Sequence, residues 1–595
     1  MWPALGLAAI GGIMSKLKIL KNPECLCILV LIFSLWGALM FQSRIENVRL
    51  FQGMDAQEGS MPVLKKMEEG ERFSVEFDIE SKLENYNLAI IPDDCAEEVV
   101  INGHAIDLRN FADNCNFSKG FVLRDSLIAL YRVGNRTHYS FSMRNKGGDA
   151  GLNAHVVQTS PLSISMGVLA ILSLSLLCFF IAWRIGFGWV PAVIIFLAVV
   201  IRAVFLMNIP YTNFSYDVDG HVAYVQYLVE NHSVPGVDDC WTCYHPPVYY
   251  VSAVPSYLFG EWLGVSGTTG LQAYSLLLSI VTVFLGMLFL RSFLSGKALG
   301  IASVLWAFWP VMILVSPRIG NDQLFYMLHM LCMWGGVNYL KEGRGKYLLV
   351  AVIATAFAMW TKATAVVTLG TLFVFVILGY WVNLRRRRLT CSEWVSAGLL
   401  LLLVVAIVLQ HLLGDSTLVG NSSGLAGRLK VGNEAFNYIF FDLKSFVVHP
   451  FTSAWNDDLG REYFWNYAFK TSLFGEFEMV RNVVGRNLAT IMSCTFLGLI
   501  VYAARSFWKT KLRMIHWFLL LQGAAFIAAL MFLRMKHPYS CSNDFRYILP
   551  AIICFIPFVA QGITSEGTSI KWKVLGYGLV LAFVLCTTVL FILAM

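Results

Sequence analysis

The stretch Ser215-Tyr-Asp-Val-Asp-Gly-His-Val-Ala-Tyr-Val-Gln-Tyr-Leu228 places Asp217, Asp219 and His221 within five residues of one another. It comes directly after a long apolar segment that ends near Pro210. Carboxylates at the boundary between a membrane and water cost free energy, and they usually mark a functional site. The side of the membrane that this stretch faces therefore decides where the chemistry of the chain takes place.

The composition is that of a membrane protein. Of the 595 residues, 57% are hydrophobic and 14% are charged, and the mean hydropathy is +0.63. Soluble domains average about 45–50% apolar and about 25% charged residues. The sequence therefore predicts an integral protein with many α-helical spans. The meaning of the net charge of +7 then depends on where Lys and Arg lie relative to the spans, and we do not expect nucleic-acid binding.

Apolar runs predict about thirteen transmembrane helices. They are expected at 25–41, 162–183, 190–209, 271–293, 298–316, 323–340, 347–360, 364–383, 393–413, 486–505, 513–533, 547–563 and 572–594. Lys16, Lys18 and Lys21 place the start of the first span in the cytoplasm. From that start, the predicted cytoplasmic loops, including the run Arg385–Arg388, are all basic, as the positive-inside rule requires.

This count places the Asp217 stretch outside the cytoplasm. The five Asn-x-Ser/Thr sequons, at Asn116, Asn135, Asn213, Asn231 and Asn421, all fall in segments that the count puts outside. The expected location is a cell (inner) membrane with an external site, or an endoplasmic reticulum membrane.

Residues 44–158 differ from the rest of the chain. Short runs of alternating apolar and polar residues, such as Phe73-Ser-Val-Glu-Phe-Asp-Ile79, are separated by turn residues. This pattern predicts an inserted extracytoplasmic β-sandwich-like domain. We therefore expect an N-terminal segment with the first span at 1–43, the β domain at 44–158, and a transmembrane core at 159–595 with external loops at 211–270, 414–485 and 534–546. Whether the β domain recognises an acceptor or glycan, or only stabilises the external face, stays open.

Five cysteines lie in polar segments: Cys95, Cys115, Cys240, Cys243 and Cys541. In an oxidising compartment, the first two can pair with each other, and Cys240 can pair with Cys243 or Cys541.

The predicted external face gathers residues from distant parts of the chain. Besides the Asp217 stretch, it carries His245, Asp322, Lys362 and Arg546. Cations beside carboxylates and a histidine suit an anionic headgroup together with a proton acceptor. Lys362 would hold a phosphate as a point charge and Arg546 as a bidentate fork. The alternative for each cation alone is that it extends from a span to the interface.

These motifs resemble those of GT-C membrane glycosyltransferases. Asp217-Val-Asp-Gly-His-Val-Ala-Tyr224 and Tyr244-His-Pro-Pro-Val-Tyr-Tyr250 are similar to the first external loop of protein O-mannosyltransferases (glycosyltransferase family 39) and bacterial aminoarabinose transferases. Asn321-Asp322, Thr361-Lys-Ala-Thr-Ala365 and Asp544-Phe-Arg-Tyr-Ile-Leu-Pro550 add to the resemblance, which covers about residues 190–560.

The resemblance implies transfer of a sugar from a polyprenyl-phosphate-linked donor to a protein, lipid or glycan acceptor outside the cytoplasm. An aspartate would act as general base, and cations would hold the phosphate leaving group. Where the family has Asp-Glu, this chain has Asp217-Val-Asp219, so the base is Asp217 by alignment or Asp219. The substrate-binding candidates are His221, Tyr224, His245, Asp322, Lys362 and Arg546.

Two further questions stay open at this stage. Asp217, Asp219 and His221 could bind a divalent metal such as Mg²⁺ or Mn²⁺, because carboxylates are hard oxygen ligands. The chain could also be a transporter or flippase of a lipid-linked sugar or another anionic solute, or a receptor or assembly factor with a non-catalytic core. Transporters usually carry ionisable residues near the centres of their spans. Here the charges cluster at span ends, which favours an enzyme.

Overall fold

The structure is a computed structural model. It describes residues 22–40, 43–53, 55–59, 61, 63–81, 85–93, 95–115, 120–146, 149–158, 161–215, 217–237, 239–263, 265–383, 390–413, 429–456, 460–480, 482–509 and 512–595. These residues form two compact units. One unit comprises residues 1–181, 210–216 and 256–270, and the other comprises 182–209, 217–255 and 271–595.

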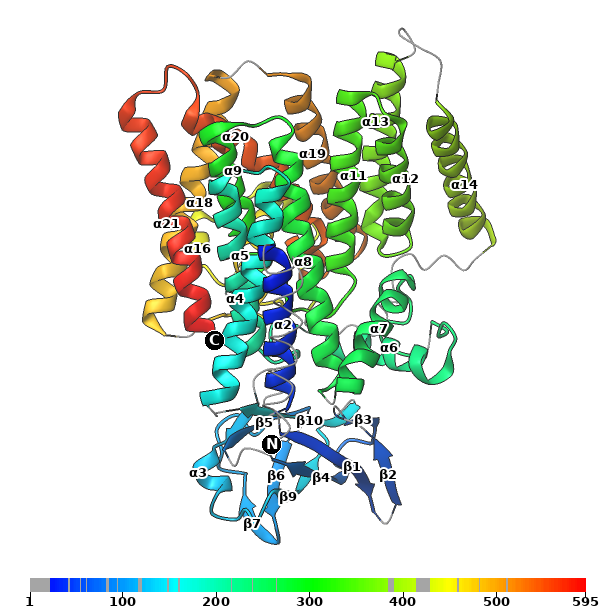
Figure 1. Cartoon of the computed structure of the whole chain (residues 1–595), viewed down its shortest axis with the longest axis vertical. Helices are drawn as coiled ribbons and strands as arrows, with labels where there is room; N and C mark the ends of the chain where they lie inside the picture. The colour runs from blue at the N-terminus through cyan, green and yellow to red at the C-terminus, as the bar shows by residue number, and fades with distance from the viewer. Residues whose placement is uncertain are drawn as a thin grey trace. The chain divides into compact units, whose positions relative to one another are not determined.

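Among the described residues, the first unit contains ten strands and three helices (Figure 1). The helices are α2 (Pro23–Met40), a short α3 (Asp125–Ile128) between strands, and α4 (Pro161–Arg184), whose last residues belong to the second unit. The strands are β1 (Arg44–Gln52), β2 (Asp55–Gly59), β3 (Val63–Lys66), β4 (Arg72–Glu80), β5 (Tyr86–Pro92), β6 (Cys95–Ile101), β7 (His104–Asp107), β8 (Phe121–Leu123), β9 (Arg136–Arg144) and β10 (Asp149–Gln158).

The strands form two antiparallel sheets. One has the order β2-β1-β4-β9-β6-β7 and the other the order β3-β10-β5-β8. Strict alternation explains the arrangement: in β4, Phe73, Val75, Phe77 and Ile79 are buried, and the residues between them face the other way. The buried residues of both sheets make one hydrophobic core. Within it the hydroxyls of Tyr86 and Tyr139 share a hydrogen bond of 2.9 Å.

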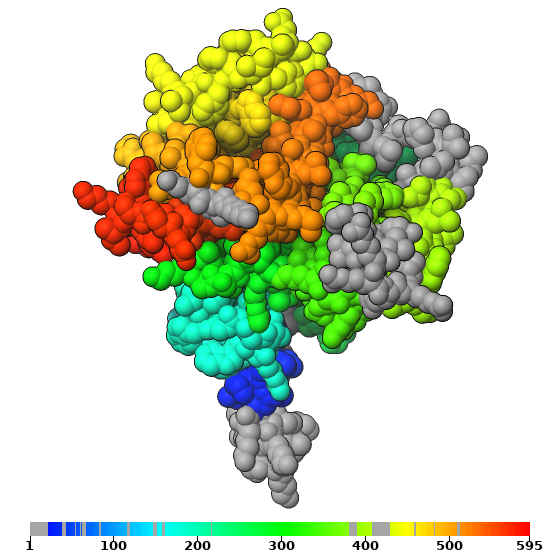
Figure 2. All heavy atoms as spheres, turned by 90° about the horizontal axis from the view of Figure 1, so that it is seen from above, coloured from blue at the N-terminus to red at the C-terminus, as the bar shows by residue number. Residues whose placement is uncertain are grey.

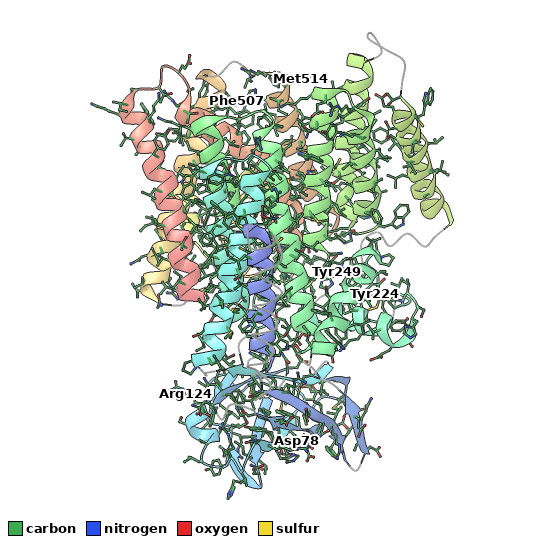
Figure 3. All side chains as sticks on the ribbon, viewed as in Figure 1. Asp78, Arg124, Tyr224, Tyr249, Phe507 and Met514 are labelled. Atoms are coloured by element: carbon green, nitrogen blue, oxygen red, sulfur yellow. A yellow bond between two sulfur atoms is a disulfide. The ribbon has the colours of Figure 1, made fainter. Side chains whose placement is uncertain are left out.

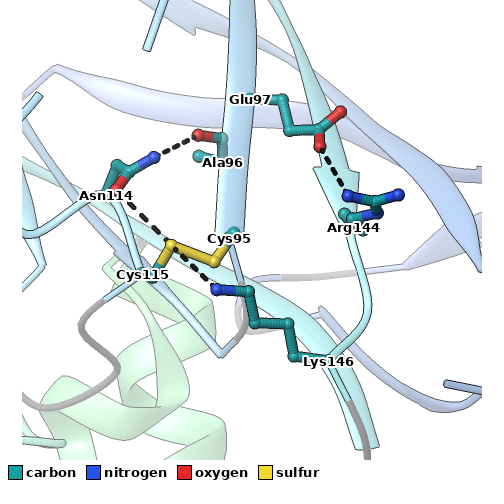
Figure 4. Close-up of a disulfide and its surroundings, with 7 residues drawn as sticks. All are labelled: Cys95, Ala96, Glu97, Asn114, Cys115, Arg144 and Lys146. Atoms are coloured by element: carbon teal, nitrogen blue, oxygen red, sulfur yellow. Dashed lines mark hydrogen bonds and ion pairs between the residues drawn. A yellow bond between two sulfur atoms is a disulfide. The ribbon is translucent and has the colours of Figure 1, made fainter. Parts of the chain in front are cut away.

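A disulfide joins Cys95 at the start of β6 to Cys115 (Figure 4). The predicted pairing of these two cysteines is confirmed. The crosslink closes the segment that runs through the β6–β7 hairpin, and near it the Glu97 carboxylate lies 3.9 Å from Arg144.

The second unit is a helical bundle. Its long helices are α5 (Trp189–Asn208), α8 (Gly267–Arg291, which begins in the first unit), α11 (Asp322–Glu342), α13 (Val366–Asn383), α14 (Cys391–Leu413), α18 (Val483–Lys509), α19 (Met514–Lys536) and α21 (Ile570–Ala594). The shorter ones are α6 (Val218–Asn231), α7 (Val248–Leu263, which ends in the first unit), α9 (Gly296–Ala307), α10 (Pro310–Leu314), α12 (Gly345–Met359), α15 (Ala435–Ile439), α16 (Leu443–Val448), α17 (Phe464–Phe474) and α20 (Ile552–Thr564). Three 3₁₀ turns lie at Ala363–Ala365 (η2), Ser540–Asn543 (η6) and Phe545–Ala551 (η7).

A helix lies at each of the thirteen segments predicted to span. By length and apolar composition, seven of those in the described part of the chain could cross a membrane on their own. They are Pro161–Arg184, Trp189–Asn208, Gly267–Arg291, Val483–Trp508, Met514–Lys536, Ser540–Thr564 and Ile570–Ala594. These helices identify an integral membrane protein, whereas the count of thirteen and the orientation stay predictions.

Two predicted continuous spans are interrupted. The 298–316 segment breaks after α9, and α10 restarts at Pro310, which occupies the first turn that proline favours. The 547–563 segment begins as the 3₁₀ turn η7, in which Ile548 has non-helical backbone angles, and becomes α-helical only at Ile552. Arg318 follows the end of α10, and Arg546 lies within η7, so both charged residues lie outside the α-helices.

The bundle packs by neighbouring helices. α11 packs against α12 and α13, and α18 packs against α20 and α21 (Figure 1). In the space-filling view, the yellow segment that contains α15 and α16 lies beside the orange residues (Figure 2). Lys430, before α15, and Tyr539, between α19 and η6, form an isolated β-bridge.

Several sequence predictions lie outside the described residues. These are the basic run Arg385–Arg388, the N-terminal lysines, part of the 414–485 loop, and the sequons at Asn116 and Asn421. Of the other sequons, Asn135 and Asn231 are exposed and Asn213 is half-buried.

Candidate functional site

The first functional side chain lies at the start of α6. Asp217 is the N-cap residue of this helix, a position that aspartate favours. Its side chain does not cap the helix. Instead, Asp217 Oδ2 accepts a hydrogen bond of 3.2 Å from Arg546 Nη2. The structure thus joins two predicted site residues that are 329 positions apart in the sequence.

The second pair is deeper in the protein. Asp322 lies in the first turn of α11, and Lys362 lies between α12 and η2. Lys362 Nζ donates a hydrogen bond to Asp322 Oδ1, and both side chains are buried. Two predicted site residues therefore form a buried ion pair.

Tyr547 brings the two cations together. Its ring centre is 4.8 Å from Lys362 Nζ and 5.0 Å from Arg546 Cζ. Both distances are within the range of cation–π attraction. The two residues predicted to hold a phosphate therefore flank one aromatic ring.

The predicted histidines and Tyr224 form an aromatic stack beside these pairs. His221 Nδ1 and Tyr250 Oη share a hydrogen bond of 2.7 Å, and the rings of Tyr224 and Tyr250 stack with centres 3.7 Å apart. Figure 3 shows Tyr224 on α6 near Tyr249 of α7. The His221 ring also stacks on His245, at 5.7 Å between centres. The hydrogen bond and the ring contacts thus join α6 to the His-Pro-Pro segment.

A glycine holds the next loop against this stack. Gly320 N–H donates a 3.0 Å hydrogen bond to Tyr249 Oη. Its φ is +154°, and a Cβ at this position would lie 3.2 Å from His221 Nε2. A side chain at position 320 would therefore press on His221.

Burial and charge set the protonation of the residues near α6. Burial lowers the pKa of His221 to about 4 and that of His245 to about 3, so both imidazoles are neutral at pH 7. Burial by itself would raise the pKa of Asp217, but the positive charge of Arg546 lowers it to about 2. Asp217 is therefore ionised, and its side chain remains 35% exposed.

Three charged residues of this cluster were not singled out from the sequence. Asp544 Oδ2 lies 2.9 Å from Arg546 Nε, and Glu476 Oε1 lies 4.0 Å from Arg546 Nη2. Arg318 exerts its positive charge on Asp217, Asp322, Glu476 and Asp544. Burial raises the pKa of Glu476, whose other oxygen accepts a 2.7 Å hydrogen bond from Tyr467.

Arg318 differs from the other two cations. Lys362 and Arg546 are each paired with a carboxylate, whereas Arg318 forms no ion pair within the described ranges, and its buried Nη2 has no hydrogen-bond partner there. A signal in the sequence was available, because Ser316-Pro-Arg318 follows an apolar run and directly precedes Asn321-Asp322.

The candidate metal ligands are arranged differently from a metal site. Asp217 bonds to the Arg546 guanidinium, and His221 Nδ1 bonds to Tyr250. In the described part of the chain, no group of three or more His, Cys, Asp or Glu side chains is placed to hold an ion. This arrangement does not fit a divalent cation, since the Arg546 charge occupies the carboxylate that would bind it. Metal dependence stays a prediction from the sequence.

The second predicted disulfide is resolved by the structure. Cys240 pairs with Cys243, and Cys541 is a free thiol. This crosslink lies just before Tyr244 and His245, and Gly220 of α6 packs against the same turn, since a Cβ there would lie 2.6 Å from Thr242.

A comparison of the sequence with known families bears directly on this site. Residues 245–411 match the family model described as dolichyl-phosphate-mannose-protein mannosyltransferase. The match confirms the predicted resemblance to a GT-C glycosyltransferase. The matched segment contains His245, Arg318, Asp322 and Lys362, whereas Asp217 and Arg546 lie outside it. No curated protein matches the chain.

Three solved structures show weak similarity to the chain. The oligosaccharyltransferase of Archaeoglobus fulgidus in its apo form is 11% identical, with a TM-score of 0.39, and the match covers 69% of this chain and 56% of that one. The complex of AglB from the same organism with an inhibitory peptide and a dolichol-phosphate is 12% identical, with a TM-score of 0.40 and the same coverage. The arabinosyltransferase EmbB from Mycobacterium smegmatis is 11% identical, with a TM-score of 0.36, and the match covers 91% of this chain and 53% of that one. The match thus spans little more than half the length of each of these proteins.

Proposed function

We propose that this protein transfers a sugar from a polyprenyl-phosphate-linked donor to an acceptor hydroxyl on the extracytoplasmic side of its membrane. One observation carries the proposal: Lys362 and Arg546 flank the Tyr547 ring, and each is paired with a carboxylate, Asp322 or Asp217. The family match at residues 245–411 supports a lipid-phosphate donor, because that family is described by a dolichyl-phosphate-linked sugar. The acceptor is a protein, lipid or glycan.

In this mechanism Arg546, Lys362 and Arg318 hold the phosphate of the donor. Arg318 is the cation best prepared for this role, since its buried Nη2 has no partner within the described residues. Phosphate is a good leaving group once its charge is stabilised, so the sugar moves directly to the acceptor and no covalent enzyme intermediate is needed.

Asp217 is the general base. With Arg546 beside it, its pKa is about 2, and a carboxylate this acidic is a weak proton acceptor. A donor phosphate competes with Asp217 for the Arg546 guanidinium. As the phosphate takes a share of that charge, the pKa of Asp217 rises and the carboxylate becomes a stronger base. The base is therefore activated when the donor is in place.

The remaining residues position the base. The neutral His221 bonds to Tyr250, and Tyr224 stacks on the same ring, so the first turn of α6 is held rigidly. Asp219 lies in this turn, half-buried, and is the second candidate for the base. No step in this mechanism is assigned to a metal.

The decisive experiment is transfer of a radiolabelled sugar from polyprenyl-phosphate donors by the purified protein. We expect Asp217→Asn to lower turnover by about 10²- to 10⁴-fold, which is the contribution of a general base. Donor binding should be retained. Glu230→Gln is the matched control, because Glu230 is an exposed carboxylate on the same helix.

Each other outcome has a clear meaning. Full activity in Asp217→Asn with loss of activity in Asp219→Asn would move the role of base to Asp219. Full activity in both variants would contradict the mechanism. Binding and movement of the donor across the bilayer without any transfer would favour the flippase instead.

A further inference from the structure

The outer face of the six-stranded sheet in the first unit contains a hollow of about 390 Å³. Pockets that hold small ligands have volumes of about 300–1,000 Å³. The hollow is lined by β1, β4, β9 and β6 and by Arg109, which follows β7. All of its lining residues belong to the first unit, whereas the charged cluster belongs to the second.

The strand register explains the hollow. Phe51 of β1 is opposite Ser74 of β4, Ser74 is opposite Ser142 of β9, and Ser142 is opposite Glu98 of β6. Small side chains therefore occupy the two central strands of this row. The larger side chains of Phe51 on one flank and Glu98 on the other form its walls.

A β-bulge adds a second carboxylate. In β6 the register shifts between Ala96 and Glu98, because these two residues oppose the consecutive partners Met143 and Ser142. Glu97 is the extra residue, and both Glu97 and Glu98 line the hollow. A regular strand would send two consecutive side chains to opposite faces, so the bulge redirects one of them.

The polar groups in the hollow are unequally engaged. Arg72 lies 3.4 Å from Glu97, and the Arg109 guanidinium makes two hydrogen bonds to Asp107. Within the described ranges, the Glu98 carboxylate and the hydroxyls of Ser74 and Ser142 make no hydrogen bond or ion pair. Acceptors and hydroxyls are thus available on a rigid surface beside an aromatic ring.

We propose that this hollow binds a neutral saccharide. Its lining charges, Arg72 and Arg109 against Glu97 and Glu98, sum to zero, so an anionic ligand gains nothing from them. A carboxylate accepts hydrogen bonds from sugar hydroxyls, serine hydroxyls donate or accept, and Phe51 offers a face to the C–H side of a sugar ring. The hollow is on a sheet face and mostly polar, which does not suit an added peptide strand or a lipid chain.

The test uses the full-length protein in phosphatidylcholine nanodiscs, because glucoside and maltoside detergents carry sugars themselves. The probes are maltose, cellobiose, lactose and α-1,2-mannobiose, with glucuronate as the anionic comparison. Saturation-transfer NMR at up to about 10 mM detects affinities in the millimolar range. At least one neutral disaccharide should bind the wild-type protein, and glucuronate should bind more weakly.

The matched variants are Glu98→Gln and Glu80→Gln. Glu80 is also an exposed carboxylate of the same sheet, but it does not line the hollow. Glu98→Gln should weaken binding by about tenfold or more, since it removes a charged hydrogen-bond acceptor, and Glu80→Gln should leave it unchanged. Absence of binding by every neutral probe, equal binding by Glu98→Gln, or preferred binding of glucuronate would overturn the proposal. Thermal unfolding of each variant verifies that the fold is retained.

Discussion

Arginine–aspartate pairs occur on the β-sheet face and in the charged cluster of the helical unit, but their surroundings differ. Arg109 and Asp107 lie 2.7 Å apart, with side chains 71% and 45% exposed. Arg546 and Asp544 lie 2.9 Å apart, with side chains 8% and 2% exposed. Water competes for the first pair and screens it, so it contributes little to stability. The second pair has lost its water, so each charge depends on its protein neighbours.

This difference explains what each surface can do. On the sheet face, a carboxylate such as Glu98 can stay unpaired at little cost, and it is available to sugar hydroxyls. In the cluster, leaving one charge unpaired is expensive, and a ligand that supplies the missing partner gains that free energy. An anionic group such as a phosphate therefore suits Arg318.

The largest effect should follow from breaking the buried pair of Lys362 and Asp322. We expect Lys362→Met to lower the free energy of unfolding by about 3–5 kcal/mol, because Asp322 is left buried without its partner. Thermal denaturation followed by size-exclusion chromatography measures the loss. Arg109→Met on the sheet face is the matched control and should cause no measurable shift.

A double variant tests the reason for that loss. Lys362→Met combined with Asp322→Leu removes both charges, and its stability should return toward that of the wild type. A loss equal to that of Lys362→Met alone would show that packing, rather than the uncompensated charge, is responsible.

An intermediate effect is expected at Arg318. Arg318→Gln should weaken binding of the polyprenyl-phosphate donor by about 10- to 100-fold, since a hydrogen bond to a charged group contributes about 1.5–3 kcal/mol. The control is Arg486→Gln, an exposed arginine that pairs with Glu478. Equal donor affinity in the two variants would remove Arg318 from the site.

The smallest effect is expected on the sheet face, at Asp78. Burial by itself would raise the pKa of this carboxyl, but hydrogen bonds from Asn47, Arg136 and His138 lower it to about 2. Because the pKa of Asp78 is lower in the folded than in the unfolded protein, its ionised form stabilises the fold at a pH above the unfolded-state pKa of about 4. This stabilisation is lost as the pH falls from about 4 toward 2. Asp78→Asn should therefore cost on the order of 1–2 kcal/mol at neutral pH.

The measurement for Asp78 is unfolding as a function of pH. The difference in stability between the wild type and Asp78→Asn should shrink as the pH is lowered through this window. A difference that stays constant down to pH 2 would assign the effect to the hydrogen bonds of the neutral side chain.

Several features were set by the sequence alone because they depend on local spacing. Alternation in Phe73–Ile79 predicted a strand with one buried face, and long apolar runs predicted helices at their observed places. The position of Cys95 and Cys115 in polar segments predicted that they could pair, and the structure joins them.

The partners of each charge were decided only by the tertiary structure. Lys362 and Arg546 were expected to hold a phosphate, but the sequence did not reveal that Asp322 and Asp217 pair with them, because the residues of these pairs are 40 and 329 positions apart. Arg318 follows α10, Glu476 follows α17 and Asp544 directly precedes η7, so the packing of segments between helices brings these charges together. The β6 bulge that turns Glu97 and Glu98 to one face is likewise a matter of register. Periodicity fixes which side of an element a residue occupies, whereas packing of distant elements fixes which charges meet, how dry they are, and therefore what they can bind.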